Sequence, residues 1–173
     1  MTLAAAPSVT SDYAKPAIRV VVGDDHSLMR RTLRLLLERE GGLEVVAEAS
    51  DVPAAIRHVH EQRPHVLVLD LSMPNGGSLD AVRRLREQVP GTAIIVLAME
   101  DDPAYAQQAI EAGAIGYVLK DIADTDLPQA VRSAVRGEPF VSRRVGALLK
   151  AMRPSAQGDD PPGAPRGERS AAR

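Results

Sequence analysis

The nine residues Val66-Leu67-Val68-Leu69-Asp70-Leu71-Ser72-Met73-Pro74 decide how the rest of the chain is interpreted. The four aliphatic residues that open this stretch show no polar alternation, which is typical of a short strand buried on both faces of a parallel sheet. Asp70 stands at the C-terminal end of this predicted strand. Ligands bind at that edge of open α/β sheets, so Asp70 is a candidate for chemistry. Taken alone, however, Asp70 is better interpreted as a cap of the turn before Pro74.

Composition and charge narrow the class of protein. A chain of 173 residues is long enough for one domain with extensions and too short for two ordinary domains. With 21 basic and 23 acidic residues the net charge is -2, so no bulk attraction to nucleic acid or membrane is indicated. The chain has no cysteine, which excludes disulfides, thiolate metal sites and thiol catalysis. Without a secretory signal or an apolar run of spanning length, a cytoplasmic location is expected.

Five short apolar segments alternate with five segments of helical periodicity. The expected strands cover residues 18–22, 45–49, 66–70, 93–97 and 115–119. Each pair of parallel strands needs a crossover helix, so this alternation predicts an α/β fold with a doubly wound, five-stranded parallel sheet. The expected strand order is the flavodoxin-like order 2-1-3-4-5.

The domain organisation follows from changes in composition. Residues 1–17 are expected to be a flexible leader, residues 18–137 the folded domain, and residues 138–152 a linker with one short amphipathic helix. Residues 153–173 contain four Pro and three Gly but no Leu, Ile, Val, Met or aromatic residue. Such a segment cannot bury a core, so a disordered tail is predicted.

Charged side chains follow three of the predicted strands. Asp24 and Asp25 leave the first strand at the same edge as Asp70 leaves the third, and the expected order makes these strands neighbours. Three converging carboxylates need a cation among them, and an all-oxygen set with room for water suits Mg²⁺. Lys120 adds a positive charge at the end of the fifth strand. Together these groups could stabilise a phosphoryl group on Asp70.

The same residues carry a family resemblance. Asp24 with Asp25, the segment Asp70 to Pro74, and the segment Gly116 to Asp121 resemble the signature of receiver domains of bacterial two-component response regulators. The resemblance covers roughly residues 18–137. Within that class, residues 23–26, 112–121 and 137–142 are most similar to the NarL/FixJ (LuxR-type) subfamily.

The resemblance implies roles for individual residues. Asp70 would accept a phosphoryl group from a sensor histidine kinase, and Lys120 would contact that group. Tyr117 would be the switch aromatic that changes rotamer on activation. The implied Mg²⁺ ligands are Asp24, Asp25, Asp70 and the backbone carbonyl of Ser72. The chain is expected to act as a signalling module in a phosphorelay rather than as an enzyme. It could form a homodimer. No membrane and no small-molecule substrate beyond a phosphodonor is expected.

Three departures from the family pattern qualify these expectations. Ala98 replaces the Thr or Ser whose hydroxyl contacts the phosphoryl group, and Ser78 stands where a Gly is usual. Subfamily members also carry a helix-turn-helix domain, whereas only the Pro/Gly tail follows here, so no nucleic-acid contact is expected from this chain. Its role in transcription control would be exerted through partners.

Particular residues support or disfavour three alternative functions. A degenerate receiver, acting as a phosphorylation-independent interaction module, is supported by Ala98 and Ser78. An aspartyl-phosphate hydrolase is disfavoured because Ser72 occupies the place of its second Asp. A flavin or nucleotide binder is disfavoured because Asp24 and Asp25 would repel a phosphate where a Gly/Ser/Thr loop should hold it.

Overall fold

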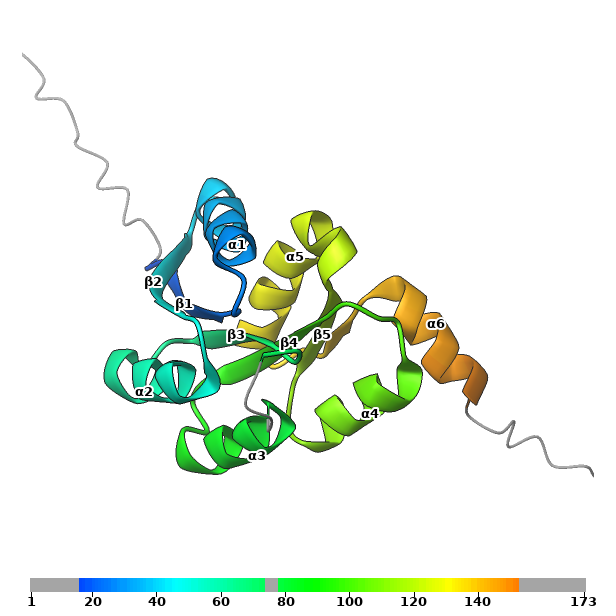
Figure 1. Ribbon diagram of the computed structural model, residues 1–173. Helices are drawn as coiled ribbons and strands as arrows, with labels where there is room; N and C mark the ends of the chain where they lie inside the picture. The colour runs from blue at the N-terminus through cyan, green and yellow to red at the C-terminus, as the bar shows by residue number, and fades with distance from the viewer. Residues whose placement is uncertain (1–15, 74–77, 153–173) are drawn as a thin grey trace, which may run out of the picture.

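A six-stranded parallel sheet runs through the centre of the computed structural model, which describes residues 16–73 and 78–152 (Figure 1). The strands are β1 (Ile18–Gly23), β2 (Leu43–Ala49), β3 (Val66–Asp70), β4 (Ala93–Ala98), β5 (Gly116–Leu119) and β6 (Phe140–Val141). Their order is β2-β1-β3-β4-β5-β6, and every neighbouring pair is parallel. The predicted fold class and the order of the first five strands are confirmed.

The sixth strand corrects the prediction of a five-stranded sheet. Phe140 donates its backbone N–H to the Ile115 carbonyl at 3.0 Å, and Ser142 donates to the Tyr117 carbonyl at 2.9 Å. The predicted linker helix within residues 138–152 is therefore preceded by a strand, and α6 begins only at Arg143. A two-residue strand has no measurable periodicity, so the sequence pattern could not indicate it.

Helices cover both faces of the sheet. Their bounds are α1 (Ser27–Arg39), α2 (Val52–Gln62), α3 (Ser78–Gln88), α4 (Pro103–Glu111), α5 (Ala123–Val135) and α6 (Arg143–Met152), with a short 3₁₀ helix, η1 (Lys120–Ile122), before α5. Helices α1 and α5 pack on one face, and α2, α3 and α4 pack on the other (Figure 1). Helix α6 lies against α4, beyond the β5 and β6 edge.

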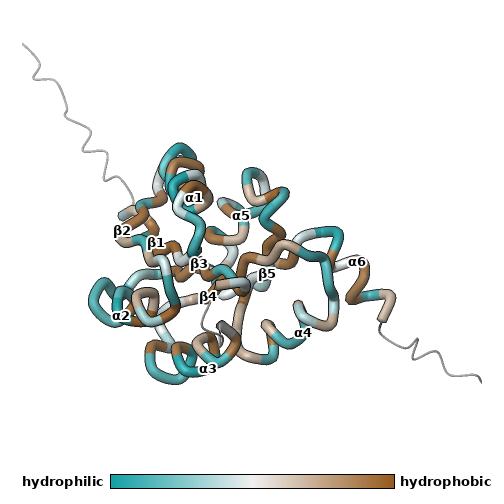
Figure 2. Tube along the Cα trace, viewed as in Figure 1, coloured by the Kyte–Doolittle hydropathy of each residue, from teal (hydrophilic) through white to brown (hydrophobic). Residues whose placement is uncertain are grey.

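Burial on both faces explains the unbroken apolar pattern of the central strands. All five residues of β3 are buried, and Figure 2 shows the hydrophobic residues concentrated in the sheet and on the inner sides of the helices. Two helices begin at capping aspartates: the Asp51 carboxylate accepts from Ala54 N at 2.7 Å, and the Asp102 carboxylate accepts from Ala104 N at 2.9 Å. These caps satisfy otherwise unpaired N–H groups and fix where α2 and α4 leave the sheet edge.

The predicted tail, residues 153–173, and most of the predicted leader lie outside the described residues. Within residues 16–73 and 78–152, no helix combines the length and the apolar character needed to span a membrane.

Candidate functional site

The predicted carboxylates meet at the C-terminal edge of the sheet. Strands β1 and β3 are neighbours, with Gly23 opposite Leu69, so the residues that follow them leave the sheet side by side. The side chains of Asp24 and Asp70 are fully buried, and that of Asp25 is 26% exposed. One ligand atom each from Asp24, Asp25, His26 and Asp70 lies within 4.8 Å of the others. The structure thus brings together the three carboxylates that the strand order places at one edge.

Lys120 completes this cluster from η1. Its Nζ lies 2.6 Å from Asp70 Oδ2 and 2.8 Å from Asp24 Oδ2, and the side chain is only 4% exposed. Burial lowers the pKa of Lys120, but its close contacts with the negatively charged carboxylates of Asp24 and Asp70 outweigh burial, so the net pKa is raised. The ammonium therefore stays charged at neutral pH and partly compensates the buried acids.

Ser72 orients the carboxylate of Asp70. Its backbone N–H donates to Asp70 Oδ1 at 2.9 Å, and its hydroxyl donates to the same oxygen at 2.7 Å. Ser72 is an exposed residue, whereas the Asp70 that it contacts is fully buried. The family resemblance implies a role for Ser72 only through its backbone carbonyl. The hydroxyl contact was missed, although the two-residue separation from Asp70 is typical of an Asx-type turn.

Contacts from His26 and Arg30 hold the acidic turn after β1. The backbone N–H of His26 donates to Asp24 Oδ1 at 2.8 Å, and the Arg30 guanidinium donates to the Asp24 carbonyl at 2.6 Å. His26 Nδ1 lies 3.0 Å from Asp25 Oδ1, although the imidazole is 71% exposed. His26 thus lies at the rim of the site.

The donor set fits a hard divalent cation. Two buried carboxylate oxygens of the described residues, Asp24 Oδ2 and Asp25 Oδ1, make no well-formed hydrogen bond, even though Lys120 and His26 nitrogens approach them within ion-pair distance. Buried oxygens in this condition are costly unless a cation or water satisfies them. Magnesium prefers oxygen ligands of this kind and retains several waters. The acidic cluster therefore has the chemistry of a magnesium site.

A cavity of about 310 Å³ adjoins the cluster beside Ala98. Its lining residues are Leu71, Ser72, Ala98, Met99, Glu100, Asp102, Tyr105 and Tyr117. Tyr117 is fully buried, and its hydroxyl donates to the Glu100 carbonyl at 3.2 Å. Burial, followed by the nearby charge of Asp102, raises the Tyr117 pKa to about 12. The aromatic ring therefore lies inward and is tied to the loop between β4 and α4.

Ser78, the other departure from the family pattern, is the first residue of α3. It follows residues 74–77, and its side chain lies outside the described part of the chain. Its effect on the loop after Asp70 stays a prediction.

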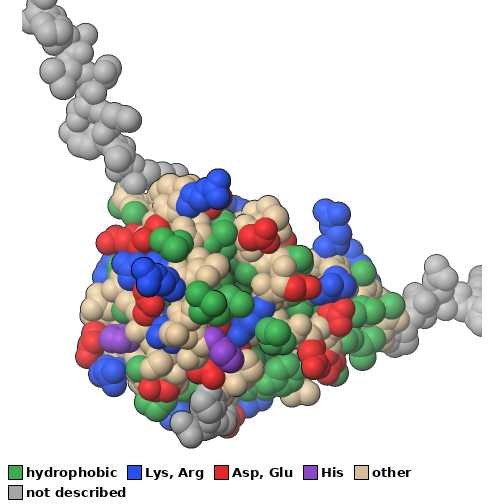
Figure 3. Space-filling view, turned by 45° about the horizontal axis from the view of Figure 1, so that its top comes forward, with side chains coloured by type: hydrophobic (Ala, Val, Ile, Leu, Met, Phe, Trp, Pro, Cys, Tyr) green, Lys and Arg blue, Asp and Glu red, His purple; other side chains and the backbone are tan. Residues whose placement is uncertain are grey.

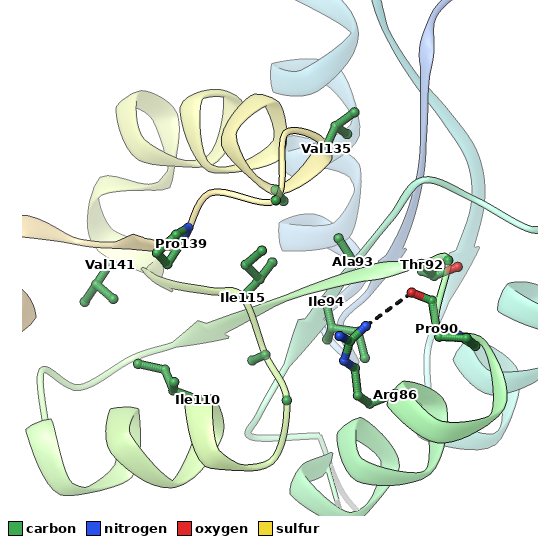
Figure 4. Close-up of a pocket in the computed structure, with 15 residues that line it drawn as sticks. Arg86, Pro90, Thr92, Ala93, Ile94, Ile110, Ile115, Val135, Pro139 and Val141 are labelled. Carbon is green, nitrogen blue, oxygen red and sulfur yellow. Dashed lines mark hydrogen bonds between the residues drawn. The ribbon is translucent and has the colours of Figure 1, made fainter.

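A larger cavity lies at the opposite edge of the sheet. It has a volume of about 540 Å³ and is lined mainly by apolar residues from the ends of α3, α4 and α5 (Figure 4). The Arg86 guanidinium donates to the Pro90 carbonyl at 3.2 Å beside it (Figure 4). None of the site residues predicted from the sequence lines this cavity. On the face seen in Figure 3, acidic and basic side chains are interspersed.

The fold and the cluster define a class of protein. A buried carboxylate at the end of β3, two acids after β1 and a lysine after β5 form the arrangement that the receiver resemblance implies. Residues 20–132 match the family model described as "Response regulator receiver domain", and the chain belongs to this family.

Individual relatives indicate the subfamily of response regulators that the chain resembles. The oxygen regulatory protein NreC of Staphylococcus epidermidis (strain ATCC 35984) is 40% identical over 133 residues, which cover 76% of this chain and 61% of NreC. The chain thus spans about three fifths of the length of the curated relatives it matches. Their identity over most of the chain confirms the resemblance to NarL/LuxR-type regulators.

Solved structures agree with this placement. A LuxR-family response regulator from Aurantimonas sp. SI85-9A1 has a TM-score of 0.75 at 34% identity, covering 78% of this chain and 96% of that one. The isolated receiver domain of RcsB from Salmonella enterica serovar Typhimurium, determined with the phosphomimetic BeF3-, has a TM-score of 0.71 at 33% identity, covering 77% of this chain and 99% of that one.

Proposed function

We propose that this chain accepts a phosphoryl group on Asp70 from a sensor histidine kinase and signals by a conformational change that serves transcription control. The observation that carries the proposal is the position of Lys120 Nζ, 2.6 Å from Asp70 Oδ2 and 2.8 Å from Asp24 Oδ2. A lysine buried between acids contributes little to the stability of the fold, because the cost of desolvating the charges offsets much of their attraction. The same arrangement is well suited to a reaction that adds negative charge to Asp70.

Each side chain of the site has its own role in phosphoryl transfer. An Asp70 oxygen attacks phosphorus, the bond from phosphorus to the imidazole nitrogen of the donor breaks, and that nitrogen keeps the electron pair. The Lys120 ammonium faces the charge that the transferred oxygens bring. The Ser72 N–H holds the carboxylate in place, while the Ser72 hydroxyl leaves Asp70 Oδ1 if that oxygen is the nucleophile.

Asp24, Asp25, Asp70 and the Ser72 carbonyl would hold Mg²⁺. Mg²⁺ bound there would supply positive charge beside the phosphoryl oxygens. His26 N–H and the Arg30 guanidinium keep the Asp24–Asp25 turn in position through their bonds to Asp24. The chain itself acts as a signalling module rather than as an enzyme, and its partners are the kinase and a second copy of the chain.

Ala98 supports a second candidate function. Its methyl group stands at the end of β4, where it faces the cavity next to Asp70 and offers no hydrogen bond. A receiver that lacks this donor could bind partners without being switched by phosphorylation. The two candidates differ in whether a phosphoryl analogue binds and changes the loop after β4.

Titration with beryllofluoride, followed by NMR of the full chain, tests the proposal. In the presence of Mg²⁺ we expect saturable changes at residues 24–25, 70–73 and 98–102. Asp70→Asn and Asp25→Asn should abolish or weaken them. Asp80→Asn is the matched control, because Asp80 is an exposed acid on α3 that pairs only with Arg83 among the described residues. A wild type without Mg²⁺-dependent changes, or an Asp70→Asn variant with the same changes, would overturn the proposal.

A further inference from the structure

A single guanidinium joins helix α6 to both loops that flank the candidate site. Arg144 Nε lies 3.0 Å from Asp101 Oδ2, and Arg144 Nη2 lies 2.7 Å from Asp121 Oδ2. Asp101 belongs to the loop after β4, three residues beyond Ala98. Asp121 belongs to η1 and directly follows Lys120. Acidic and basic side chains accordingly lie next to one another on the α6 side of the face in Figure 3.

The start of α6 is anchored firmly enough to give Arg144 a fixed position. Ser142 is fully buried; its hydroxyl accepts from Leu119 N at 3.1 Å and donates to Asp126 Oδ2 at 2.5 Å. One turn further on, Val145 is also fully buried. The first turn of α6 is therefore held against β5 and α5, with Arg144 between these two anchors.

Few side-chain contacts from other elements hold the loop after β4 in position. Tyr117 holds the Glu100 carbonyl from β5, and Arg144 holds Asp101 from α6. Ala98 contributes no hydrogen bond from its side chain. Leu148 of α6, together with Arg144, also lines a hollow against residues 99–103. The loop thus lies between the phosphorylation site on one side and α6 on the other.

We propose that Arg144 is a positioning residue that links the docking of α6 to the state of the phosphorylation site and favours the phosphate-free arrangement. The proposal rests on the function proposed above, because it concerns regulation of that site. A guanidinium fork fits two carboxylates only at one spacing, so a movement of η1 with Lys120, or of the loop after Ala98, breaks one of its contacts. By linkage, whatever releases Arg144 then favours phosphoryl binding, and phosphoryl binding favours release of α6.

The role assigned to Arg144 is not general stabilisation. Arg144, Asp101 and Asp121 are each about half exposed. Ion pairs of that kind contribute little to global stability, and we expect the melting temperature of an Arg144 variant to stay within about 2 °C of the wild type. A change in the site without a change in melting temperature therefore separates positioning from folding.

Three variants of the full chain test the proposal. Arg144→Ala removes both ion pairs, Arg144→Lys keeps the charge but loses the fork, and Arg143→Ala is the control. Arg143 is exposed on the same turn and forms no ion pair among the described residues. The measurements are hydrogen exchange of residues 99–102 and 145–152, and the affinity for beryllofluoride with Mg²⁺.

We expect Arg144→Ala to speed exchange in both segments and to tighten beryllofluoride binding by about two- to fivefold, the range that exposed ion pairs allow. Arg144→Lys should recover part of both effects, and Arg143→Ala should match the wild type. Unchanged or weaker binding in Arg144→Ala, or an equal effect of Arg143→Ala, would overturn the role of Arg144 alone. A wild type that fails to bind beryllofluoride would overturn the proposed function and this proposal with it.

Discussion

Replacing Ala98 with Thr should sharpen the response of this receiver to phosphorylation. Ala98 ends β4 and lines the cavity of about 310 Å³ beside Asp70, so there is space next to its side chain for a hydroxyl and a methyl group. A β-branched residue also suits a strand. In wild type no side-chain donor extends from this position toward a phosphoryl group on Asp70.

The size of the effect follows from the hydrogen bond that Thr supplies. A hydroxyl that donates to a charged phosphoryl oxygen contributes about 1.5–3 kcal/mol, and it does so only in the phosphorylated arrangement. Because about 1.4 kcal/mol changes a two-state ratio tenfold, Ala98→Thr should shift the ratio of active to inactive state by about ten- to hundredfold. Wild type should therefore take up the phosphoryl group yet switch incompletely.

The assay is NMR of residues 98–105 and of the Tyr117 ring, with and without beryllofluoride. Ala98→Val is the matched control, because Val has the shape of Thr but no hydroxyl. We expect Ala98→Thr alone to move the signals fully to a second state. If the wild-type signals already move fully, or if Ala98→Val acts as well as Ala98→Thr, the missing hydroxyl does not limit the switch.

Three further predictions concern other residues of the site. Ser72→Ala removes a 2.7 Å hydrogen bond to Asp70 Oδ1 and should speed labelling by acetyl phosphate up to about tenfold, which phosphorylation kinetics would measure; slower labelling would contradict this. Because burial raises the pKa of Tyr117 to about 12, the free energy of unfolding should fall between pH 10 and pH 12, and denaturation of Tyr117→Phe should show a smaller fall. Asp25→Ala should weaken Mg²⁺ binding and labelling together, and unchanged Mg²⁺ affinity by NMR would contradict this.

The sequence predicted most of the sheet because its central strands are buried on both faces. An unbroken apolar run such as Val66 to Leu69 is possible only where helices cover both sides, and the structure shows that burial. Strand order then places the carboxyl ends of β1 and β3 together, so the meeting of Asp24 and Asp70 could be anticipated. Helix starts were predictable at Asp51 and Asp102 because capping is a local interaction.

The parts that were missed depend on contacts between distant segments. Strand β6 has two residues and exists because Phe140 and Ser142 pair with β5, which no periodicity records. The bridge from Arg144 to Asp101 and Asp121 joins three elements, and a charge pattern along the chain cannot distinguish it from a solvated face. Full burial of Tyr117 likewise results from packing of the loop after β4 over the strand.

The most direct test of Asp70 as the phosphoacceptor is the mass of the intact chain after incubation with acetyl phosphate and Mg²⁺, followed by mapping of the modified peptide. We expect one phosphoryl adduct on Asp70, lost when Mg²⁺ is chelated and absent from Asp70→Asn, while Asp80→Asn is modified like the wild type. An unmodified wild type, or an adduct that persists in a folded Asp70→Asn variant, would contradict the assignment of Asp70 as the phosphoacceptor.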